Sequence, residues 1–291
     1  MPYEEIIGCN RVWDFGMHLW ITKLGLVTGI SAAAIGSSWA AQPLMASRSP
    51  LVQQQGASDP QCDRRNFRIV IDVGHSAKSP GAMSARGVAE YRFNTLLADA
   101  VAETLKRDGF QAVTVVTNQG AGRADLVTRN ARANAAKPDA FLSLHHDAVQ
   151  KKYLEKWTTE FGVEQSYSDR FSGYSVFVSN KNEFPGESVK LAELLGAELM
   201  ARGLSFTRHH AEDIPGERHP WVNSALGVYR TDNLIVLKGT KAPAALLEAG
   251  VIVNRSEELQ LASPRRRAVM AEAVSSAMAK FCAARTVSAS R

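Results

Sequence analysis

Short apolar runs alternate with longer amphipathic stretches from residue 67 to residue 284. The apolar runs have the length of strands, and the stretches between them repeat apolar residues at helical spacing. This pattern predicts strands at 67–73, 112–117, 140–145, 174–179, 234–238 and 244–249, and helices at 88–107, 125–135, 186–202 and 264–284. The alternation indicates an α/β fold with a single twisted, mostly parallel sheet and helices on both faces.

The N-terminal part of the chain lacks this pattern. Residues 24–41 carry no charge, follow Lys23 and end in small residues, which is typical of a secretory signal. Met17 is an alternative start, because a chain beginning there has a compact signal with one positive charge. We therefore predict a signal peptide at 1–41 and export to the periplasm, the cell wall or the extracellular space. The alternative is a membrane anchor formed by residues 24–44.

Composition sets the broad class of the rest of the chain. Residues 42–66 are rich in Gln, Ser, Pro, Asp and Arg, which predicts a flexible linker. One domain at 67–285 and a short tail at 286–291 follow. Hydrophobic and charged contents of 45% and 22% are ordinary for a globular protein and argue against disorder. The net charge of +5 is too small to identify a partner. We expect a monomer and no nucleic-acid partner.

Two of the three cysteines lie outside the predicted signal peptide. Cys62 precedes the first predicted strand, and Cys282 lies near the end of the last predicted helix. In an oxidising compartment the two could form a disulfide. Two unpaired thiols are an equal alternative, because a sequence gives no Cα separation.

Polar residues stand at the ends of three predicted strands and at the start of the first helix. They are His75 after the first strand, Glu90 in the first helix, His145 at the end of the third strand and Glu248 near the end of the last. The carboxyl ends of parallel strands share one edge, where ligands bind. Two imidazoles and a carboxylate can hold zinc with one position open, and a further glutamate can activate water. The set predicts a zinc hydrolase.

Only one of two adjacent histidines can face such a site. Strand alternation places His145 on the same side as Asp147, whereas His146 shares its side with leucines. We therefore choose His145, although a bulge at the strand end would reverse the choice. Glu90 alone would be interpreted as a carboxylate at a helix N-terminus. Glu248 lies inside an apolar run, where an unpaired charge is costly.

Several short motifs follow one another between Arg68 and Phe281. They are Ile69-Val70-Ile71-Asp72-Val73-Gly74-His75, Gly81-Ala82, Gly87, Glu90, Leu126, Arg129, Ala133-Asn134, Ser143-Leu144-His145-His146-Asp147-Ala148, Pro243, Leu247-Glu248-Ala249-Gly250 and Asn254. In this order and spacing they resemble the zinc-dependent N-acetylmuramoyl-L-alanine amidases of the Amidase_3 type. The resemblance implies that His75, Glu90 and His145 bind one Zn²⁺ and that Glu248 is the catalytic glutamate. It also implies peptidoglycan as substrate and hydrolysis of the amide between N-acetylmuramic acid and L-alanine.

Further polar residues lie close to these motifs in the sequence. We assign Arg132, Asn134 and Asp147 to support of the ligands or to substrate contact. His210, with His209 and His219, lies in a loop rich in Pro and Gly. A second metal site, a substrate-contacting rim and loop histidines without a role are the alternatives there, and we prefer the rim.

The polar stretch at 149–172 is longer than a tight connection requires. Tyr153, Leu154, Trp157 and Phe161 recur in it at helical spacing, which predicts a short amphipathic helix. Such a helix could be a lid, a site for a protein activator, or a surface helix that simply packs on the domain.

Two other functions compete with the predicted amidase. One is a zinc hydrolase that cuts a different cell-wall amide. The other is a non-catalytic wall-binding or regulatory module with the same fold. Retention of Glu248 argues against the module, because a binding protein does not require a residue that activates water.

Overall fold

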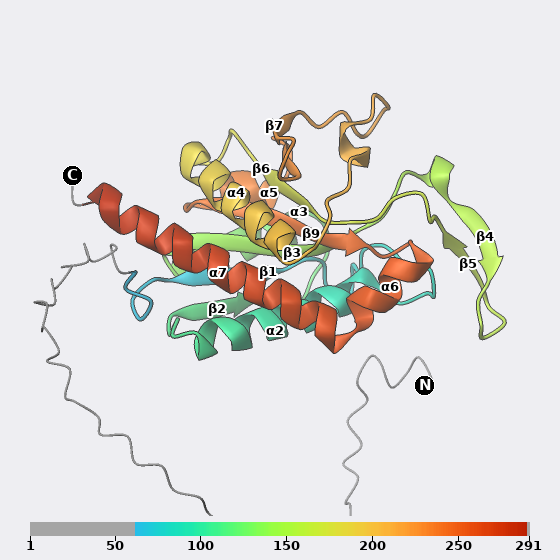
Figure 1. Ribbon diagram of the computed structural model, residues 1–291, viewed down its shortest axis with the longest axis horizontal. Coiled ribbons are helices and arrows are strands. Elements are labelled where there is room, and N and C mark those ends of the chain that lie inside the picture. Colours follow the sequence, from blue (N-terminus) through green and yellow to red (C-terminus); the bar gives the residue numbers. More distant parts are fainter. Residues whose placement is uncertain (1–61, 290–291) are drawn as a thin grey trace, which may run out of the picture. The chain divides into compact units, whose positions relative to one another are not determined.

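A seven-stranded sheet forms the centre of residues 62–289, the part of the chain that this computed structural model describes (Figure 1). The strands lie in the order β2-β1-β3-β9-β6-β8-β7. Their bounds are β1 Ile69–Val73, β2 Val113–Val116, β3 Ala140–Asp147, β6 Ser175–Val178, β7 Trp221–Asn223, β8 Val228–Arg230 and β9 Ala244–Val251. Strands β2, β1, β3 and β9 are parallel, whereas β6 is antiparallel to β9 and β7 to β8. The predicted mostly parallel sheet is confirmed.

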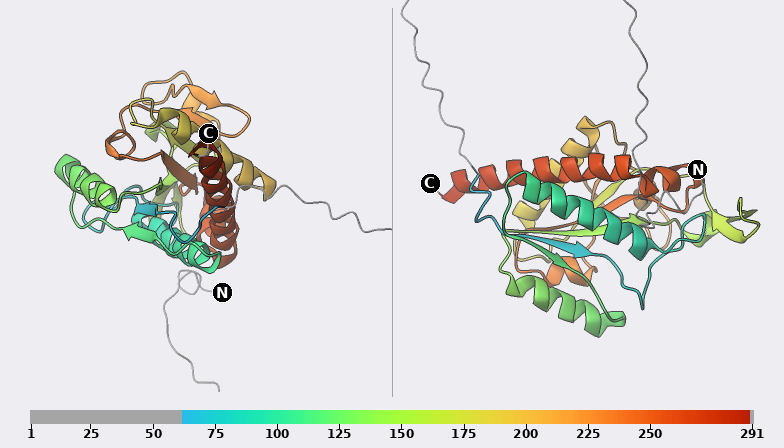
Figure 2. Two further views of the ribbon diagram at one scale, coloured as in Figure 1. Left: turned by 90° about the vertical axis from the view of Figure 1, so that its left-hand side faces the viewer. Right: turned by 90° about the horizontal axis from the view of Figure 1, so that it is seen from below.

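Helices cover both faces of this sheet, as predicted (Figure 2). Helices α2 (Glu90–Arg107), α4 (Pro185–Ala201) and α7 (Pro264–Ala289) pack on one face, and α3 (Gly122–Ala135) and α5 (Ile235–Gly239) pack on the other. Residues at helical spacing supply each contact: Leu97, Val101 and Leu105 of α2 are all buried. Each face thus has its own apolar core, and the sheet between the two cores is buried on both sides.

The register of the parallel strands determines which residues meet at their carboxyl ends. Val73 pairs with Leu144, and His145 of β3 pairs with Glu248 of β9. The β3–β9 register then shifts between His145 and Asp147. The sheet therefore brings His145 and Glu248 side by side, while Asp147 leaves the regular alternation.

One predicted strand, 234–238, is wrong. These residues form the short helix α5, whose Val236 and Leu237 pack on the face of the sheet. A short apolar run does not distinguish a strand from a buried helical turn, and both sides of β9 are already taken by β3 and β6. Strands β7 and β8 and helix α6 (Arg255–Ala262) were not predicted, because they are short and weakly periodic. Helix α7 also continues past its predicted end at 284.

The amphipathic helix predicted within 149–172 is wrong as well. A 3₁₀ turn at Lys151–Tyr153 leads into a hairpin of β4 (Glu155–Thr158) and β5 (Glu164–Tyr167), which form a separate two-stranded sheet (Figure 1). Gly162, in the left-handed region at φ 75°, lies in the turn between the two strands. The turn overrides the helical spacing of the apolar residues, which instead divide between this hairpin and a small cluster around Val251.

Most of the predicted N-terminal organisation lies outside the described residues. The signal peptide at 1–41, the alternative anchor at 24–44 and most of the linker at 42–66 fall there. Among residues 62–289, no helix is long and apolar enough to cross a membrane.

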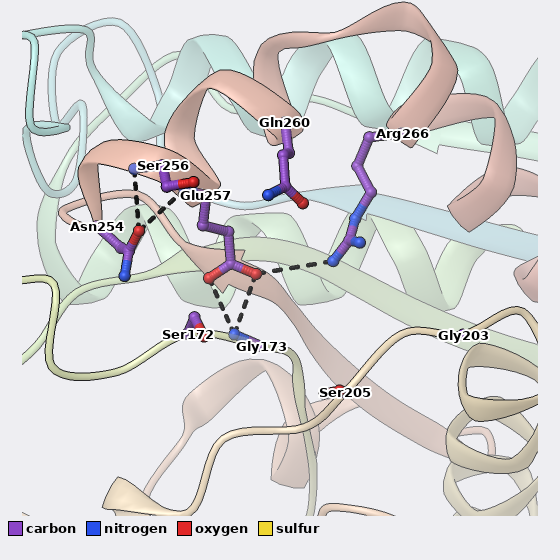
Figure 3. A pocket seen from close by; sticks show the side chains of 9 residues that line it. All are labelled: Ser172, Gly173, Gly203, Ser205, Asn254, Ser256, Glu257, Gln260 and Arg266. Atoms are coloured by element: carbon purple, nitrogen blue, oxygen red, sulfur yellow. Dashed lines mark hydrogen bonds and ion pairs between the residues drawn. The ribbon is translucent and has the colours of Figure 1, made fainter.

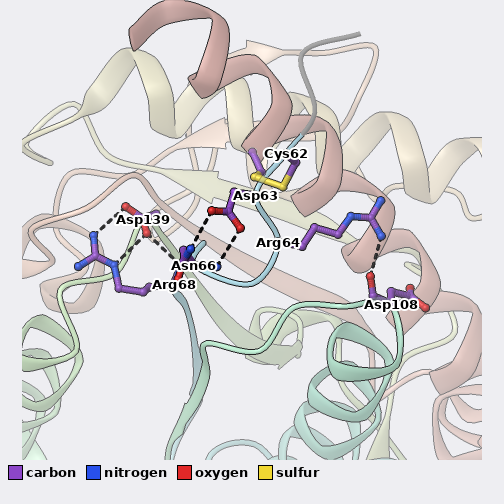
Figure 4. Close-up of a disulfide and its surroundings, with 8 residues drawn as sticks. Cys62, Asp63, Arg64, Asn66, Arg68, Asp108 and Asp139 are labelled. Atoms are coloured by element: carbon purple, nitrogen blue, oxygen red, sulfur yellow. Dashed lines mark hydrogen bonds and ion pairs between the residues drawn. A yellow bond between two sulfur atoms is a disulfide. The ribbon is translucent and has the colours of Figure 1, made fainter. Parts of the chain in front are cut away.

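A disulfide joins Cys62 to Cys282, which decides between the two alternatives left by the sequence (Figure 4). The two Cα atoms lie 5.2 Å apart. The bridge attaches the segment before β1 to α7, and Arg64 attaches the same segment to the end of α2 by donating from Nη1 to the Asp108 carbonyl at 2.7 Å. The N-terminal approach to the sheet is therefore tied to the last helix.

Replacing both cysteines by serine should destabilise the domain. The bridge closes a loop with a sequence separation of 220, so its loss should lower the free energy of unfolding by about 2–5 kcal/mol. Urea denaturation of the wild type and of Cys62→Ser/Cys282→Ser measures this loss. Chemical reduction of the wild type should lower the free energy of unfolding by a similar amount. An unchanged midpoint in both experiments would show that the bridge does not stabilise the domain.

Candidate active site

The three predicted metal ligands meet at the carboxyl edge of the sheet. Nε2 of His75 lies 2.9 Å from Oε2 of Glu90, and Nδ1 of His145 lies 3.0 Å from Oε1 of Glu90. Ligand atoms around a tetrahedral zinc ion stand about 3.4 Å apart, given metal–ligand bonds of about 2.0–2.2 Å. The separations and the donor types therefore fit a divalent metal ion held between two imidazoles and a carboxylate.

Two glycines leave room for these side chains. A methyl group at Gly74 would overlap the His145 imidazole. A methyl group at Gly81 would overlap the Glu90 carboxylate and the His75 ring, and Gly81 also adopts φ 80°. The backbone passes so close to the ligands that no larger residue fits at either position.

Backbone and amide groups hold the Glu90 carboxylate in place. Oε2 accepts the Ala82 N–H at 3.1 Å, and Oε1 accepts the His146 N–H at 3.2 Å and the Asn94 side-chain amide at 3.1 Å. Burial opposes ionisation of Glu90, but hydrogen bonds and charge from His145 and His75 outweigh it and lower its pKa. Glu90 is therefore an oriented anion at the first residue of α2.

The neighbouring histidine of β3, His146, has a structural role. His146 is buried, and its Nδ1 lies 2.7 Å from Oδ1 of Asn94. Burial lowers its pKa to about 3, so the ring stays neutral. The structure thus turns His145 toward His75 and Glu90, and His146 toward α2.

Glu248 lies next to the three candidate ligands. It lines a pocket of about 430 Å³ together with His75 and His145. Its Oε2 is buried and has no hydrogen-bond partner among the described residues. Burial raises the pKa of Glu248 well above its usual value, and the negative charges of Asp147 and Glu90 add to this effect. Glu248 is therefore a carboxyl group that holds a proton readily.

One residue that lines this pocket, Arg129, belongs to a buried ion pair. Nε of Arg129 lies 2.8 Å from Oδ1 of Asp72, whose Oδ2 accepts the Ser143 hydroxyl at 2.6 Å. Arg129 is 2% exposed and lines the pocket. In the sequence, Arg129 and Asp72 fall within the motifs but have no predicted role. A charged residue on the buried side of a helix was the signal available.

Glu248 also lines a second pocket, of about 350 Å³. Asp147 and His210 line it, and Nε2 of His210 lies 2.8 Å from Oδ2 of Asp147. Nδ1 of His210 donates to Glu217 Oε2 at 2.9 Å. Burial disfavours a charged His210, but Asp147 and Glu217 outweigh it and raise its pKa to about 10. Asp147 therefore contacts the histidine loop, and no contact with His145 is seen.

Two other predicted residues do not reach either pocket. Arg132 donates to the Thr117 carbonyl at 2.7 Å, and Asn134 donates to the Gly239 carbonyl at 3.0 Å. Asn134 also accepts the Lys241 N–H at 2.8 Å. Both residues lie on α3 and join that helix to neighbouring loops. Their closeness to the motifs in the sequence did not reveal this role.

A further polar pocket, of about 300 Å³, contains none of the predicted site residues (Figure 3). Its central acid, Glu257, accepts the Gly173 N–H on both oxygens, at 3.0 and 2.9 Å. Oε2 also accepts the Val251 N–H at 2.9 Å. These bonds join α6 to the end of β9 and to the segment before β6, so Glu257 has a structural role.

Comparison with known proteins decides the family. The sequence profile of the N-acetylmuramoyl-L-alanine amidases, Amidase_3, matches residues 69–280. The chain belongs to this family. The match covers the sheet, both helical layers and all four residues of the candidate site, so the predicted resemblance is confirmed.

Individual relatives are distant. A probable cell wall amidase of Staphylococcus aureus, LytH, is 26% identical over 208 residues, which are 71% of this chain and 55% of that protein. The chain therefore matches little more than half the length of this curated relative. The crystal structure of Ami1 from Mycobacterium smegmatis superimposes with a TM-score of 0.56 at 20% identity, covering 76% of this chain and 98% of that one. The catalytic domain of CwlV from Bacillus (Paenibacillus) polymyxa gives 0.52 at 23% identity, covering 73% and 96%. These two likenesses show the fold.

The substitution Gly74→Ala should weaken metal binding at the candidate site. The added methyl group would displace the His145 imidazole, and misplacing a ligand should reduce affinity about 10–100-fold. Competition with a coloured chelator measures the affinity for Zn²⁺. Gly186→Ala is the matched control, because a methyl group there meets no atom within 4 Å. Equal affinities for the two variants would contradict the close approach of Gly74 to His145.

Proposed function

We propose that this amidase-family protein hydrolyses the amide between N-acetylmuramic acid and L-alanine in peptidoglycan. The observation that carries the proposal is the pairing of His145 with Glu248 on adjacent strands, in one pocket with His75. This pairing joins a candidate metal-binding set to a carboxyl group that can exchange a proton.

Zinc is the metal that we propose for His75, Glu90 and His145. Two imidazole nitrogens and one carboxylate are a usual set of protein ligands in catalytic zinc sites. When bound, the ion would polarise the scissile carbonyl and increase the acidity of water beside it. Glu90 supplies the negative charge that offsets the cation, and its three N–H donors keep the carboxylate oriented.

Glu248 is the residue that we propose to move the proton. It would accept a proton from the attacking water and deliver it to the departing nitrogen of L-alanine. Its raised pKa makes Glu248 a stronger base for the first half of this transfer, and the leaving amine, which is more basic than a carboxylate, would take the proton in the second half. The positive charge of the bound ion would favour the first half by stabilising the carboxylate. No serine or cysteine nucleophile is required.

We further propose that the protein acts outside the cytoplasm. The disulfide between Cys62 and Cys282 supports this, because such bonds persist mainly in oxidising compartments. The uncharged segment after Lys23 has the composition of an export signal.

Incubation of the purified full-length chain with peptidoglycan tests the reaction. Mass spectrometry should detect free stem peptides that begin with L-alanine, and their release should stop on chelation and return with zinc. Release of fragments cut within the stem peptide would identify a hydrolase of a different amide. Absence of any product from zinc-loaded protein would favour a non-catalytic module.

Replacing Glu248 by glutamine tests its proposed role. Glu248→Gln should keep zinc affinity within about twofold but lower turnover about 10²–10⁴-fold, the usual contribution of a general acid–base group. Glu164→Gln is the control, because Glu164 is an exposed glutamate on β5 and lies in neither pocket beside Glu248. The control should retain full turnover. A Glu248→Gln variant as active as the control would remove Glu248 from the mechanism.

A further inference from the structure

A second set of metal-ligating side chains lies where the loop after α4 meets the end of β3. Oδ2 of Asp147 faces two imidazole nitrogens, Nε2 of His210 at 2.8 Å and Nε2 of His209 at 3.3 Å. All three side chains are buried. We propose that Asp147, His209 and His210 form a second site for a divalent cation, with zinc as the ion best suited to two imidazoles and one carboxylate.

The first support is the orientation of the two rings. Nδ1 of His210 donates to the Glu217 carboxylate at 2.9 Å, and Gln150 holds Glu217 by donating to its other oxygen at 2.9 Å. Nδ1 of His209 lies 2.8 Å from the Thr207 hydroxyl. Metal-binding histidines are typically held in this way through the ring nitrogen that does not touch the metal. Both rings therefore direct the remaining nitrogen, Nε2, toward Asp147.

The second support is a buried atom without a partner. His209 is 1% exposed, and its Nε2 makes no hydrogen bond within the part of the chain that the structure describes. The atom lies 3.3 Å from a carboxylate oxygen, so distance does not prevent a bond. If this nitrogen carries no proton, its lone pair faces a negative charge at close range. A cation between the two atoms would satisfy both.

Charge balance points in the same direction. His210 lies between two carboxylates, with Nε2 2.8 Å from Oδ2 of Asp147 and Nδ1 2.9 Å from Oε2 of Glu217. One protonated ring offsets only one of these two negative charges. A divalent cation held beside Nε2 would offset both negative charges. The competing explanation is an ion-pair cluster around a protonated His210, which requires no metal.

The site is open to the pocket that Glu248 also lines. Asp147 and His210 both face that pocket of about 350 Å³. Three protein ligands leave a coordination position for water or for a substrate oxygen. The bound ion would thus hold a substrate oxygen in the second pocket that Glu248 lines. The existence of the site is independent of the proposed amidase reaction, and only this role in substrate binding rests on it.

Counting bound metal tests the proposal. Full-length protein is stripped with a chelator, saturated with Zn²⁺, freed of unbound ion and analysed by elemental mass spectrometry. The wild type should bind two equivalents, and His209→Ala and His145→Ala should each bind one. His219→Gln is the matched control in the same loop and should keep two equivalents. Asp147→Asn is a second variant that should also bind one, in case His209→Ala does not fold.

Three results would overturn the proposal. The first is a wild type that saturates at a single equivalent, which His145→Ala loses and His209→Ala keeps. The second is an unchanged count of two in His209→Ala and Asp147→Asn. The third is loss of one equivalent in His219→Gln with retention of two in His209→Ala, which would move the metal to the other side of His210. None of these results depends on peptidoglycan cleavage, so a failure here is distinct from a failure of the proposed reaction.

Discussion

The placement of the Glu90 carboxylate between two imidazoles is the interaction on which the candidate site depends. Glu90 is 4% exposed, and a buried carboxylate is costly unless its oxygens are fully satisfied. Every contact that satisfies it comes from a segment that the fold must hold in position: the loop after β1, the end of β3, the interior of α2 and the glycine-rich turn before that helix. A shift of any of them would leave a buried charge without its partners. The geometry of the candidate site therefore depends on the packing of the whole domain.

The loop that leads into Glu90 shows how the domain maintains this arrangement. Glu258 of α6, which is fully buried, accepts the Ser84 hydroxyl, the Arg86 N–H and the Arg86 guanidinium. The β4–β5 hairpin adds a second anchor, because the Trp157 indole N–H donates to the Ala85 carbonyl at 2.9 Å. Elements far apart in the sequence thus hold the few residues before α2. The hairpin, which lies outside the main sheet, thus supports the turn that leads to Glu90.

Three acidic groups lie close together at this edge of the sheet, and they differ in protonation because their neighbours differ. Histidines beside Glu90 and Asp147 lower the pKa of both carboxyl groups, against the effect of burial. Among residues 62–289, Glu248 has no histidine at hydrogen-bond distance, and the charges of the other two carboxylates raise its pKa further. Two fixed anions therefore surround one group able to exchange a proton. This difference in protonation agrees with the proposed reaction, in which Glu90 binds the cation as an anion and Glu248 transfers the proton.

The sequence by itself determined the α/β class, most strands and helices, and the four residues of the candidate site. It did so because apolar periodicity is a local property of the chain, and because parallel strands bring their carboxyl ends to one edge. Only the tertiary structure decided that 234–238 is a helix, that 155–167 is a hairpin and that Cys62 pairs with Cys282. It also separated Arg132 and Asn134 from the site and brought Asp147 to His209 and His210. These outcomes depend on a strand bulge, on the two strands that already flank β9 and on contacts between distant segments. None of these can be read from the hydrophobic periodicity of the sequence.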